Sequence, residues 1–252
     1  MKLHKIPGYI QAIYLVEYPD KLMLLDGCSR ADVSTVKKYI ETQLGRPFAD
    51  LKVTMVTHMH PDHAGAAHKL REITGCKVIT ANVPGHWYKG IDGKLMHLTD
   101  IMLASWVAGR MKKPRKLIWY SPKLKADHKL NDGEVIPGFE DWQVLFTQGH
   151  TDRDLTLYHE ATSYAYVADL MVSVKGKFIP PYPVFYPNRY KQSIEKFRAL
   201  AVERTLLAHG GEVQLTDADF DYLLANAPNK PMTHWRSVKN KLVRSLGFNT
   251  EN

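Results

Sequence analysis

The stretch TMVTHMHPDHAG at residues 54–65 gives the strongest indication of the fold and of a functional site. Within it, three histidines and one carboxylate lie close together: His58, His60, Asp62 and His63. The apolar run Leu51–Thr57 before them is typical of a buried strand, and a helix is expected near Ala64. Histidine is the most common metal-binding side chain, and alternate residues of an extended loop point the same way. The stretch therefore predicts a metal site at a strand end, with enough ligands for two ions.

Three more candidate ligands follow directly after predicted strands. They are His150 after Trp142–Thr147, Asp169 after Tyr164–Ala168, and His209 after Thr205–Ala208. Each of these residues, taken alone, would be assigned a structural role. Because loops at strand ends are where α/β folds present functional groups, these residues and the histidine loop together form one predicted site.

The rest of the pattern predicts alternating strands and helices. Apolar runs at Ile10–Val16 and Leu22–Leu25, separated by a turn, indicate a β-hairpin. Apolar residues at helical spacing predict helices over Ala31–Leu44, Arg189–Ala201 and Leu215–Ala225. The last of these would be capped by Thr216 or Asp217.

With these motifs in this order, the chain resembles the metallo-β-lactamase superfamily. The resemblance covers roughly residues 8–225 and rests on Asp26, the HxHxDH loop at His58–His63, His150, Asp169 and His209. It implies an α/β (α+β) fold, a four-layer αβ/βα sandwich in which two β-sheets pack together with helices outside. We expect a single domain over residues 1–252, with a helical, basic insertion at about 84–129 that lies outside the resemblance.

The resemblance also implies a role for each ligand. His58, His60 and His150 would bind a first metal ion; Asp62, His63 and His209 would bind a second; and Asp169 would bridge the two. Asp26 is expected to orient the histidine loop. No cysteine stands in this set, so the glyoxalase II, lactonase and phosphodiesterase branches match best.

Imidazole and carboxylate ligands suit two divalent metal ions, zinc first, with iron and manganese as alternatives. Two such cations lower the pKa of a shared water toward neutrality. We therefore predict an enzyme, a dinuclear metal-dependent hydrolase in which a metal-bound hydroxide attacks an ester, thioester or lactone carbonyl. Asp62 and Asp169 would be the catalytic residues that orient this hydroxide. The first alternative is a phosphodiesterase acting on a lipid or nucleotide. The second is a mononuclear-iron redox protein or a non-catalytic metal-binding protein.

The net charge of +8 comes mainly from one segment. Residues 110–129 hold eight basic residues and one acidic residue, Asp127. An apolar helix is expected just before this segment, around Ile101–Ala108, capped by Thr99 or Asp100. This combination predicts either a peripheral membrane contact through residues 100–125 or a lid over a small-molecule substrate that is amphipathic or anionic. A homodimer contact is a further alternative, and so is a core role for three tryptophans: Trp87, Trp106 and Trp119. We expect no specific nucleic acid partner.

The composition, 44% apolar and 24% charged over 252 residues, is that of a globular protein. The first residues lack the pattern of a signal peptide, and Cys28 and Cys76 form no disulfide framework, which together predict a cytoplasmic protein. Weaker candidates for supporting roles at the site are His86, His234, Tyr182, Tyr186 and Tyr190.

Overall fold

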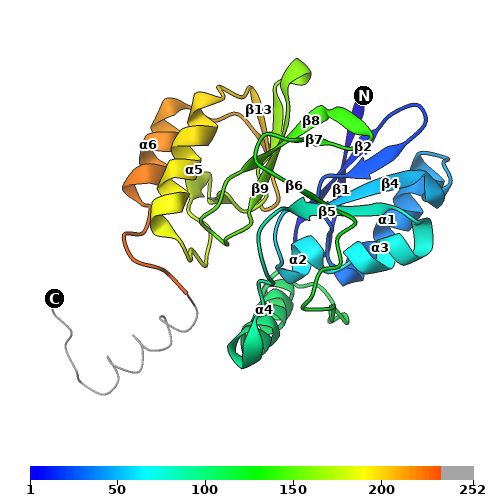
Figure 1. Ribbon diagram of the computed structural model, residues 1–252, viewed down its shortest axis with the longest axis horizontal. Helices are drawn as coiled ribbons and strands as arrows, with labels where there is room; N and C mark the ends of the chain where they lie inside the picture. The colour runs from blue at the N-terminus through cyan, green and yellow to red at the C-terminus, as the bar shows by residue number, and fades with distance from the viewer. Residues whose placement is uncertain (234–252) are drawn as a thin grey trace.

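The computed structural model of the chain describes residues 1–233 and contains two six-stranded sheets that face each other (Figure 1). The first sheet consists, in spatial order, of β1 (Lys2–Pro7), β2 (Ala12–Glu17), β3 (Leu22–Leu24), β4 (Leu51–Val56), β5 (Lys77–Ala81) and β6 (His128–Leu130). Strands β1 to β3 pair antiparallel, and β3 to β6 pair parallel. The histidine loop leaves the carboxyl end of β4, in the parallel half of this sheet.

The second sheet is mostly antiparallel. Its strands are, in spatial order, β14 (Gly211–Val213), β13 (Arg204–Leu207), β10 (Tyr164–Tyr166), β9 (Leu155–His159), β8 (Phe139–Phe146) and β7 (Val135–Ile136). Only β10 and β13 pair parallel to each other. Asp169 and His209 follow these two strands, so their parallel pairing brings both residues to the same edge of the sheet.

Helices cover the outer surface of each sheet (Figure 1). The first sheet is covered by α1 (Val33–Lys38), which continues in a π-helical turn over Tyr39–Gln43, and by α3 (Ala67–Thr74). The second is covered by α5 (Pro187–Ala199) and α6 (Asp217–Ala225). The short α2 (Pro61–Ala64) begins inside the histidine loop. The described chain also contains a hairpin of β11 (Val172–Val174) and β12 (Lys177–Ile179) and three 3₁₀ turns, Arg30–Asp32, Phe48–Asp50 and Glu160–Thr162.

The central core lies between the two sheets. It contains Met23, Val53 and Met55 from the first sheet and Trp142 and Leu157 from the second, all buried. Strand β3 shows how one strand serves two layers: Met23 faces this core, while Leu22 and Leu24 face the helices. The predicted αβ/βα sandwich is therefore confirmed, and the near-continuous apolar runs of the sequence correspond to strands that are buried on both faces.

The insertion differs from its predicted form. Its only helix in the described chain is α4 (Gly90–Arg110), which starts well before the expected cap, so the prediction of a helix capped at Thr99 or Asp100 is wrong. Residues 111–127 are not helical, and the segment ends as strand β6. Gly93 allows the early start because it packs against the Tyr88 backbone, where a Cβ would lie 2.3 Å from the carbonyl carbon. None of the described residues forms a helix long and apolar enough to cross a membrane.

Of two other predicted helices, one is interrupted and one is confirmed. The expected helix over Ala31–Leu44 is broken into a 3₁₀ turn, α1 and the π-helical turn. The C-terminal helix α6 is confirmed, with Thr216 as its N-cap in a reciprocal capping box with Asp219. Cys28 and Cys76 are both buried and form no disulfide.

Gly27 fixes the distance between the end of β3 and the histidine loop. A Cβ at this position would lie 2.4 Å from the carbonyl oxygen of His63, far inside van der Waals contact. At Gly109, near the end of α4, an added Cβ would have no heavy atom of another part of the protein within 4 Å. The two glycines therefore differ in what a methyl group would meet.

We predict opposite effects for alanine at these two positions. Gly27→Ala lowers the free energy of unfolding by about 1–3 kcal/mol, because the loop backbone must move. Gly109→Ala raises it by up to about 1 kcal/mol, because alanine has the higher helix propensity. Chemical denaturation of both variants measures the difference. Equal stability of Gly27→Ala and the wild type would contradict the close approach.

Candidate metal centre

The carboxylate of Asp26, just after β3, holds the histidine loop in place. Its Oδ1 accepts hydrogen bonds from the backbone N–H groups of Gly27 (3.0 Å) and Thr57 (3.1 Å). Its Oδ2 accepts from Thr57 Oγ1 (2.8 Å), His63 Nδ1 (2.6 Å) and the hydroxyl of Tyr166 (3.0 Å). Burial and then the nearby carboxylate raise the pKa of Tyr166 well above its usual value, so its O–H stays protonated and donates. Asp26 thus orients the loop, as the resemblance implied, and it also joins the loop to the second sheet, which was not predicted.

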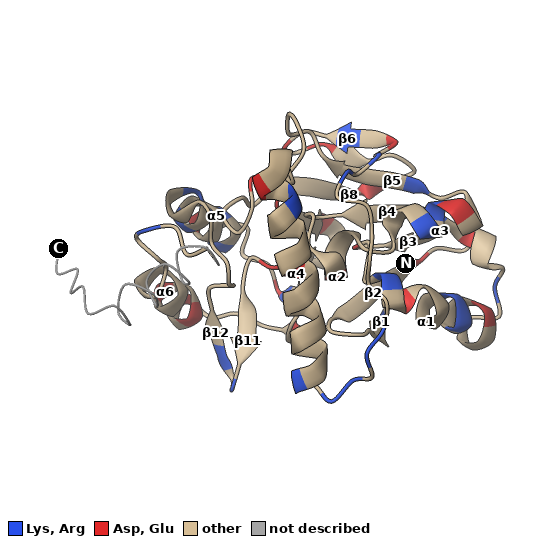
Figure 2. Cartoon of the chain, turned by 90° about the horizontal axis from the view of Figure 1, so that it is seen from below, with Lys and Arg blue, Asp and Glu red and all other residues tan. Residues whose placement is uncertain are grey.

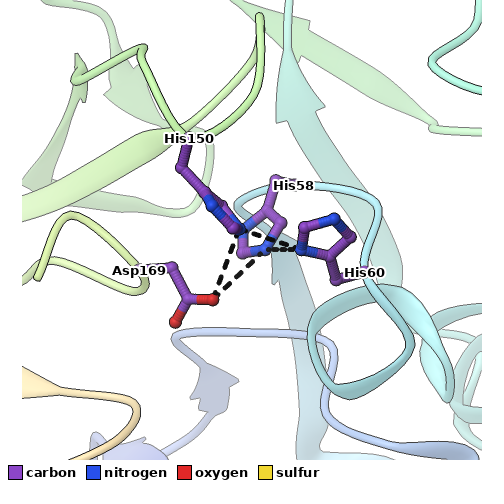
Figure 3. Close-up of side chains that lie close together, drawn as sticks. All are labelled: His58, His60, His150 and Asp169. Carbon is purple, nitrogen blue, oxygen red and sulfur yellow. Dashed lines mark hydrogen bonds and ion pairs between the residues drawn. The ribbon is translucent and has the colours of Figure 1, made fainter. Parts of the chain in front are cut away.

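Three imidazoles converge on one point beside Asp169 (Figure 3). His60 Nδ1 lies 3.1 Å from His58 Nε2 and 2.9 Å from His150 Nε2. The Oδ2 atom of Asp169 lies 3.8 Å from His58 Nε2 and 3.4 Å from His150 Nε2. All three rings are buried, and the four residues together could hold a metal ion.

The hydrogen bonds behind these rings decide which nitrogens carry protons. His150 Nδ1 lies 2.5 Å from the carbonyl oxygen of Pro183, which can only accept, so this nitrogen is the N–H. His58 Nδ1 faces Thr57 Oγ1 at 3.2 Å, and that hydroxyl already donates to Asp26. The convergent Nε2 atoms of both rings are therefore unprotonated in the neutral form. Both lone pairs face His60 Nδ1, and a neutral ring offers at most one N–H there, whereas a cation among the three rings would be bound by all of them.

A proton does not readily supply the positive charge among these three rings. Burial first, and then the neighbouring histidines, lower the pKa of His58 and His60 well below the usual value. The rings of His58 and His60 therefore stay neutral, which is the state in which imidazole binds metals. This donor set fits a divalent metal ion.

A second cluster lies on the other side of Asp169. His209 Nε2 is 3.1 Å from Asp62 Oδ2, and His63 Nε2 is 3.5 Å from the same oxygen. The Oδ1 atom of Asp169 lies 3.5 Å from His63 Nε2 and 3.6 Å from His209 Nε2. Asp62, His63 and His209 together could hold a metal ion. The two oxygens of Asp169 thus face different clusters.

Two buried atoms of this second cluster have no hydrogen-bond partner within the described residues: His63 Nε2 and Asp169 Oδ1. Buried polar atoms are nearly always paired, so both atoms are oriented for a ligand. Although burial lowers the pKa of His63, the carboxylates of Asp62, Asp169 and Asp26 raise it well above the usual value. The cluster therefore attracts positive charge, and a metal ion fits it as well.

Residues of both clusters line part of a cleft of about 240 Å³. The polar end is formed by His60, Asp62, Asp100, Asp169 and His209. The other end is apolar and includes Ile10, Leu103, Trp106, Val107 and Val172. No lysine or arginine is among the described residues that line the cleft. The shape and lining suit a substrate that has an apolar part beside the bond facing the clusters.

The structure brings together all seven residues predicted as metal ligands. His60 also has a neighbour that sequence reasoning missed: Asp100 Oδ2, from α4, lies 3.7 Å from His60 Nε2. Asp100 is fixed by Tyr88, whose hydroxyl lies 2.9 Å from the same oxygen, and burial raises its pKa to about 7. A pattern in the sequence could have revealed Asp100: it lies at helical spacing from Gly93, His97 and Ala104, and these four residues form the buried face of α4.

Of the residues predicted to support the site, some line the cleft and others lie elsewhere. Tyr182 lines the cleft, whereas Tyr190 is buried in the core between α5 and the second sheet. His86 is exposed and lies in a separate depression beside Trp87. His234 lies outside the described residues. The prediction that Trp106 and Trp119 belong to a core is wrong, because both are more than half exposed.

We predict that Asp26→Asn destabilises the protein by about 3 kcal/mol, because an amide NH₂ cannot accept the hydrogen bonds that one carboxylate oxygen receives. Asp20→Asn, at an exposed turn, should change stability by less than about 0.5 kcal/mol. Denaturant unfolding of the metal-free proteins measures both. An Asp26→Asn midpoint equal to that of the wild type would contradict the role given to Asp26.

Comparisons with solved structures support the fold. A metallo-beta-lactamase family protein from Thermus thermophilus aligns with a TM-score of 0.66 and 20% identity, covering 97% of this chain and 82% of that one. An archaeal metallo-beta-lactamase superfamily protein from Sulfolobus tokodaii aligns with a TM-score of 0.61 and 19% identity, covering 88% and 84%. At these identities the similarity establishes the sandwich architecture.

Sequence comparisons establish the family. The chain is 24% identical over 172 residues to YqjP of Bacillus subtilis, a protein described as a probable metallo-hydrolase. The match covers 64% of this chain, which spans about half the length of that relative (52%). The family model of the metallo-beta-lactamase superfamily matches residues 6–209, which include Asp26 and all seven predicted ligands. The chain therefore belongs to the metallo-beta-lactamase superfamily.

Proposed function

We propose that the protein is a dinuclear metal-dependent hydrolase that cleaves an ester, thioester or lactone whose acyl part is apolar. The observation that carries the proposal is the position of Asp169, whose two oxygens face two separate groups of metal-binding side chains. The description of the Bacillus subtilis relative as a metallo-hydrolase supports the same class of reaction.

The ligand sets suit divalent ions, with zinc first and iron or manganese as alternatives. His58, His60 and His150 would hold one ion; Asp62, His63 and His209 would hold the other; and Asp169, which lies close to both groups, would contact both. When bound, such ions supply an activated water and compensation for the charge that forms on the carbonyl oxygen.

The protein's own residues would supply orientation and the exclusion of water. His63 and the nearby histidines keep the pKa of Asp169 well below its usual value despite burial, so its carboxylate is ionised at neutral pH. The same histidine also lowers the pKa of Asp62. Both carboxylates can accept a hydrogen bond from the attacking water and hold it in line with the carbonyl. The apolar end of the cleft, with Leu103 and Val107, would exclude water from the acyl part.

The lining of the cleft favours a carbonyl substrate over a phosphodiester. Enzymes that transfer phosphoryl groups commonly place lysine or arginine against the phosphate oxygens. Among the described residues that line this cleft, neither type is present. The basic residues that first suggested a phosphodiesterase therefore lie outside the cleft, and they require another explanation.

We predict two metal ions per chain by elemental analysis of the purified protein for zinc, iron and manganese. Asp169→Ala should lose both, because this residue contacts both clusters. His86→Ala, an exposed histidine outside the clusters, should retain both. A single iron per chain would instead favour a redox protein, and a metal-free chain after growth with added zinc would contradict the proposed centre.

We further predict that the metal-loaded protein hydrolyses chromogenic esters, thioesters or lactones with a higher kcat/KM than phosphodiesters. Within an ester series, kcat/KM should rise with acyl length by up to about fourfold per methylene group, because each one is buried against apolar surface. Leu103→Ser should weaken this dependence without loss of metal. A preference for phosphodiesters would support the alternative reaction, and no dependence on acyl length would contradict the role of the apolar end.

A further inference from the structure

Helix α4 has two faces of unusual character. The face that packs on the body of the protein carries small or polar buried residues: Gly93, His97, Asp100, Ala104 and Ala108. The opposite face carries large apolar residues that are between 44% and 77% exposed: Ile91, Leu95, Leu98, Met102 and Trp106. Their spacing of three or four residues places them in one row along the helix, which we call the apolar ridge.

Met96, Ile101 and Val107 of α4 pack partly buried against the protein, but the five large apolar residues of the ridge do not. An amphipathic helix turns its apolar stripe toward the core and its polar face toward water. Here the apolar ridge faces solvent over a length of about 22 Å, taken from a rise of about 1.5 Å per residue. Leu117, 82% exposed, and Trp119, 53% exposed, follow soon after the helix. Contiguous exposed apolar surface of this kind marks a binding surface.

Positive charge flanks the ridge. Residues 110–116, which we call the basic segment, contain Arg110, Lys112, Lys113, Arg115 and Lys116 and no acidic residue. Lys89 and Lys94 lie at the other end of α4, beside Asp92. Figure 2 shows α4 crossing one face of the molecule, with basic residues at both ends and none in its middle.

The basic segment is held against the protein. The hydroxyl of Tyr9 donates to the carbonyl oxygen of Pro114 (2.8 Å), and Lys116 Nζ lies 5.6 Å from the centroid of the Tyr9 ring. At the end of the helix, the Arg110 guanidinium lies 5.4 Å from the Trp106 ring. These contacts fix the position of the basic segment relative to the apolar ridge, so the two form one continuous surface.

We propose that this surface docks on an anionic phospholipid bilayer, with the apolar ridge in the headgroup–acyl boundary and the basic segment on the lipid headgroups. An apolar face flanked by lysine and arginine has the two features that interfacial helices use. Each basic residue close to an anionic leaflet strengthens binding by about fivefold. Because the inner face of α4 packs on the protein, the helix lies in the plane of the membrane surface.

Charge argues against a second copy of the chain as the occupant. Two copies that paired through their ridges would bring two basic segments to one interface. Within residues 89–117 the acidic residues are Asp92 and the buried Asp100, which cannot balance seven lysines and arginines. Like charges without partners at an interface oppose association, whereas an anionic bilayer attracts them.

The docking surface adjoins the cleft, since Trp106 belongs to the ridge and also lines the cleft with Leu103 and Val107. Docking would place the apolar end of the cleft at the lipid surface, where an acyl chain could enter directly. This consequence rests on the proposed hydrolase function, whereas the docking itself does not.

The test is co-sedimentation of the metal-loaded full-length protein with vesicles, which requires no turnover. We expect binding to vesicles of phosphatidylcholine mixed with phosphatidylglycerol, at least about tenfold weaker binding to phosphatidylcholine alone, and weakening by salt. Leu95→Ser/Met102→Ser and, separately, Lys112→Glu/Lys113→Glu should each reduce binding by at least about tenfold. None of these four residues lines the cleft.

Matched controls change the same residue types elsewhere. Ile73→Ser alters an exposed isoleucine of α3, and Lys38→Glu/Lys52→Glu alters two exposed lysines of α1 and β4; both should bind vesicles within about twofold of the wild type. Thermal unfolding and metal content of every variant verify that it is folded. Failure of the wild type to bind anionic vesicles would overturn the proposal. So would a dimer in solution that Leu95→Ser/Met102→Ser dissociates, because a second copy would then cover the ridge.

Discussion

The structure of the site depends on one buried carboxylate, that of Asp26. It accepts hydrogen bonds from two backbone N–H groups, from Thr57 and His63 of the histidine loop, and from Tyr166 of the second sheet. It therefore joins the two sheets and fixes the loop at the same point. Because His63 Nδ1 contacts this carboxylate, His63 Nε2 is the nitrogen that faces Asp62 and Asp169. A buried carboxylate with this many donors cannot be replaced by an amide without leaving polar atoms unpaired.

From this fixed loop, the remaining ligands are positioned by the fold. His150 enters from the loop after β8, which Gly149 allows: its φ of +152° favours glycine, and a Cβ there would lie 2.5 Å from the Cα atom of Tyr190. Asp169 and His209 follow the parallel strands β10 and β13 and reach the same edge. Asp169 has three imidazoles on one side and the group of Asp62, His63 and His209 on the other, so its two oxygens have different environments. The apolar end of the cleft, provided largely by α4, adds a place for the substrate's carbon chain.

Much of this could be predicted from the sequence. The ligand motifs are short and specific, and buried strands that run into histidine or aspartate revealed both sheets. The sequence was less informative where side-chain direction decides the outcome. It predicted an apolar helix in the insertion, but neither its start at Gly90 nor the turning of its large apolar residues toward solvent, because composition does not reveal which face meets the protein. Asp100 was taken as a helix cap for the same reason, although it lies in the helix interior beside His60. The break of the first helix into a π-helical turn left no pattern in the sequence that we recognised.

The most direct test of the dinuclear centre is X-ray diffraction from crystals of the metal-loaded protein, with anomalous scattering recorded at the zinc, iron and manganese absorption edges. We predict two anomalous peaks, one among His58, His60 and His150 and the other among Asp62, His63 and His209, each within bonding distance of one oxygen of Asp169. A single peak, or peaks away from Asp169, would contradict a metal pair bridged by this residue.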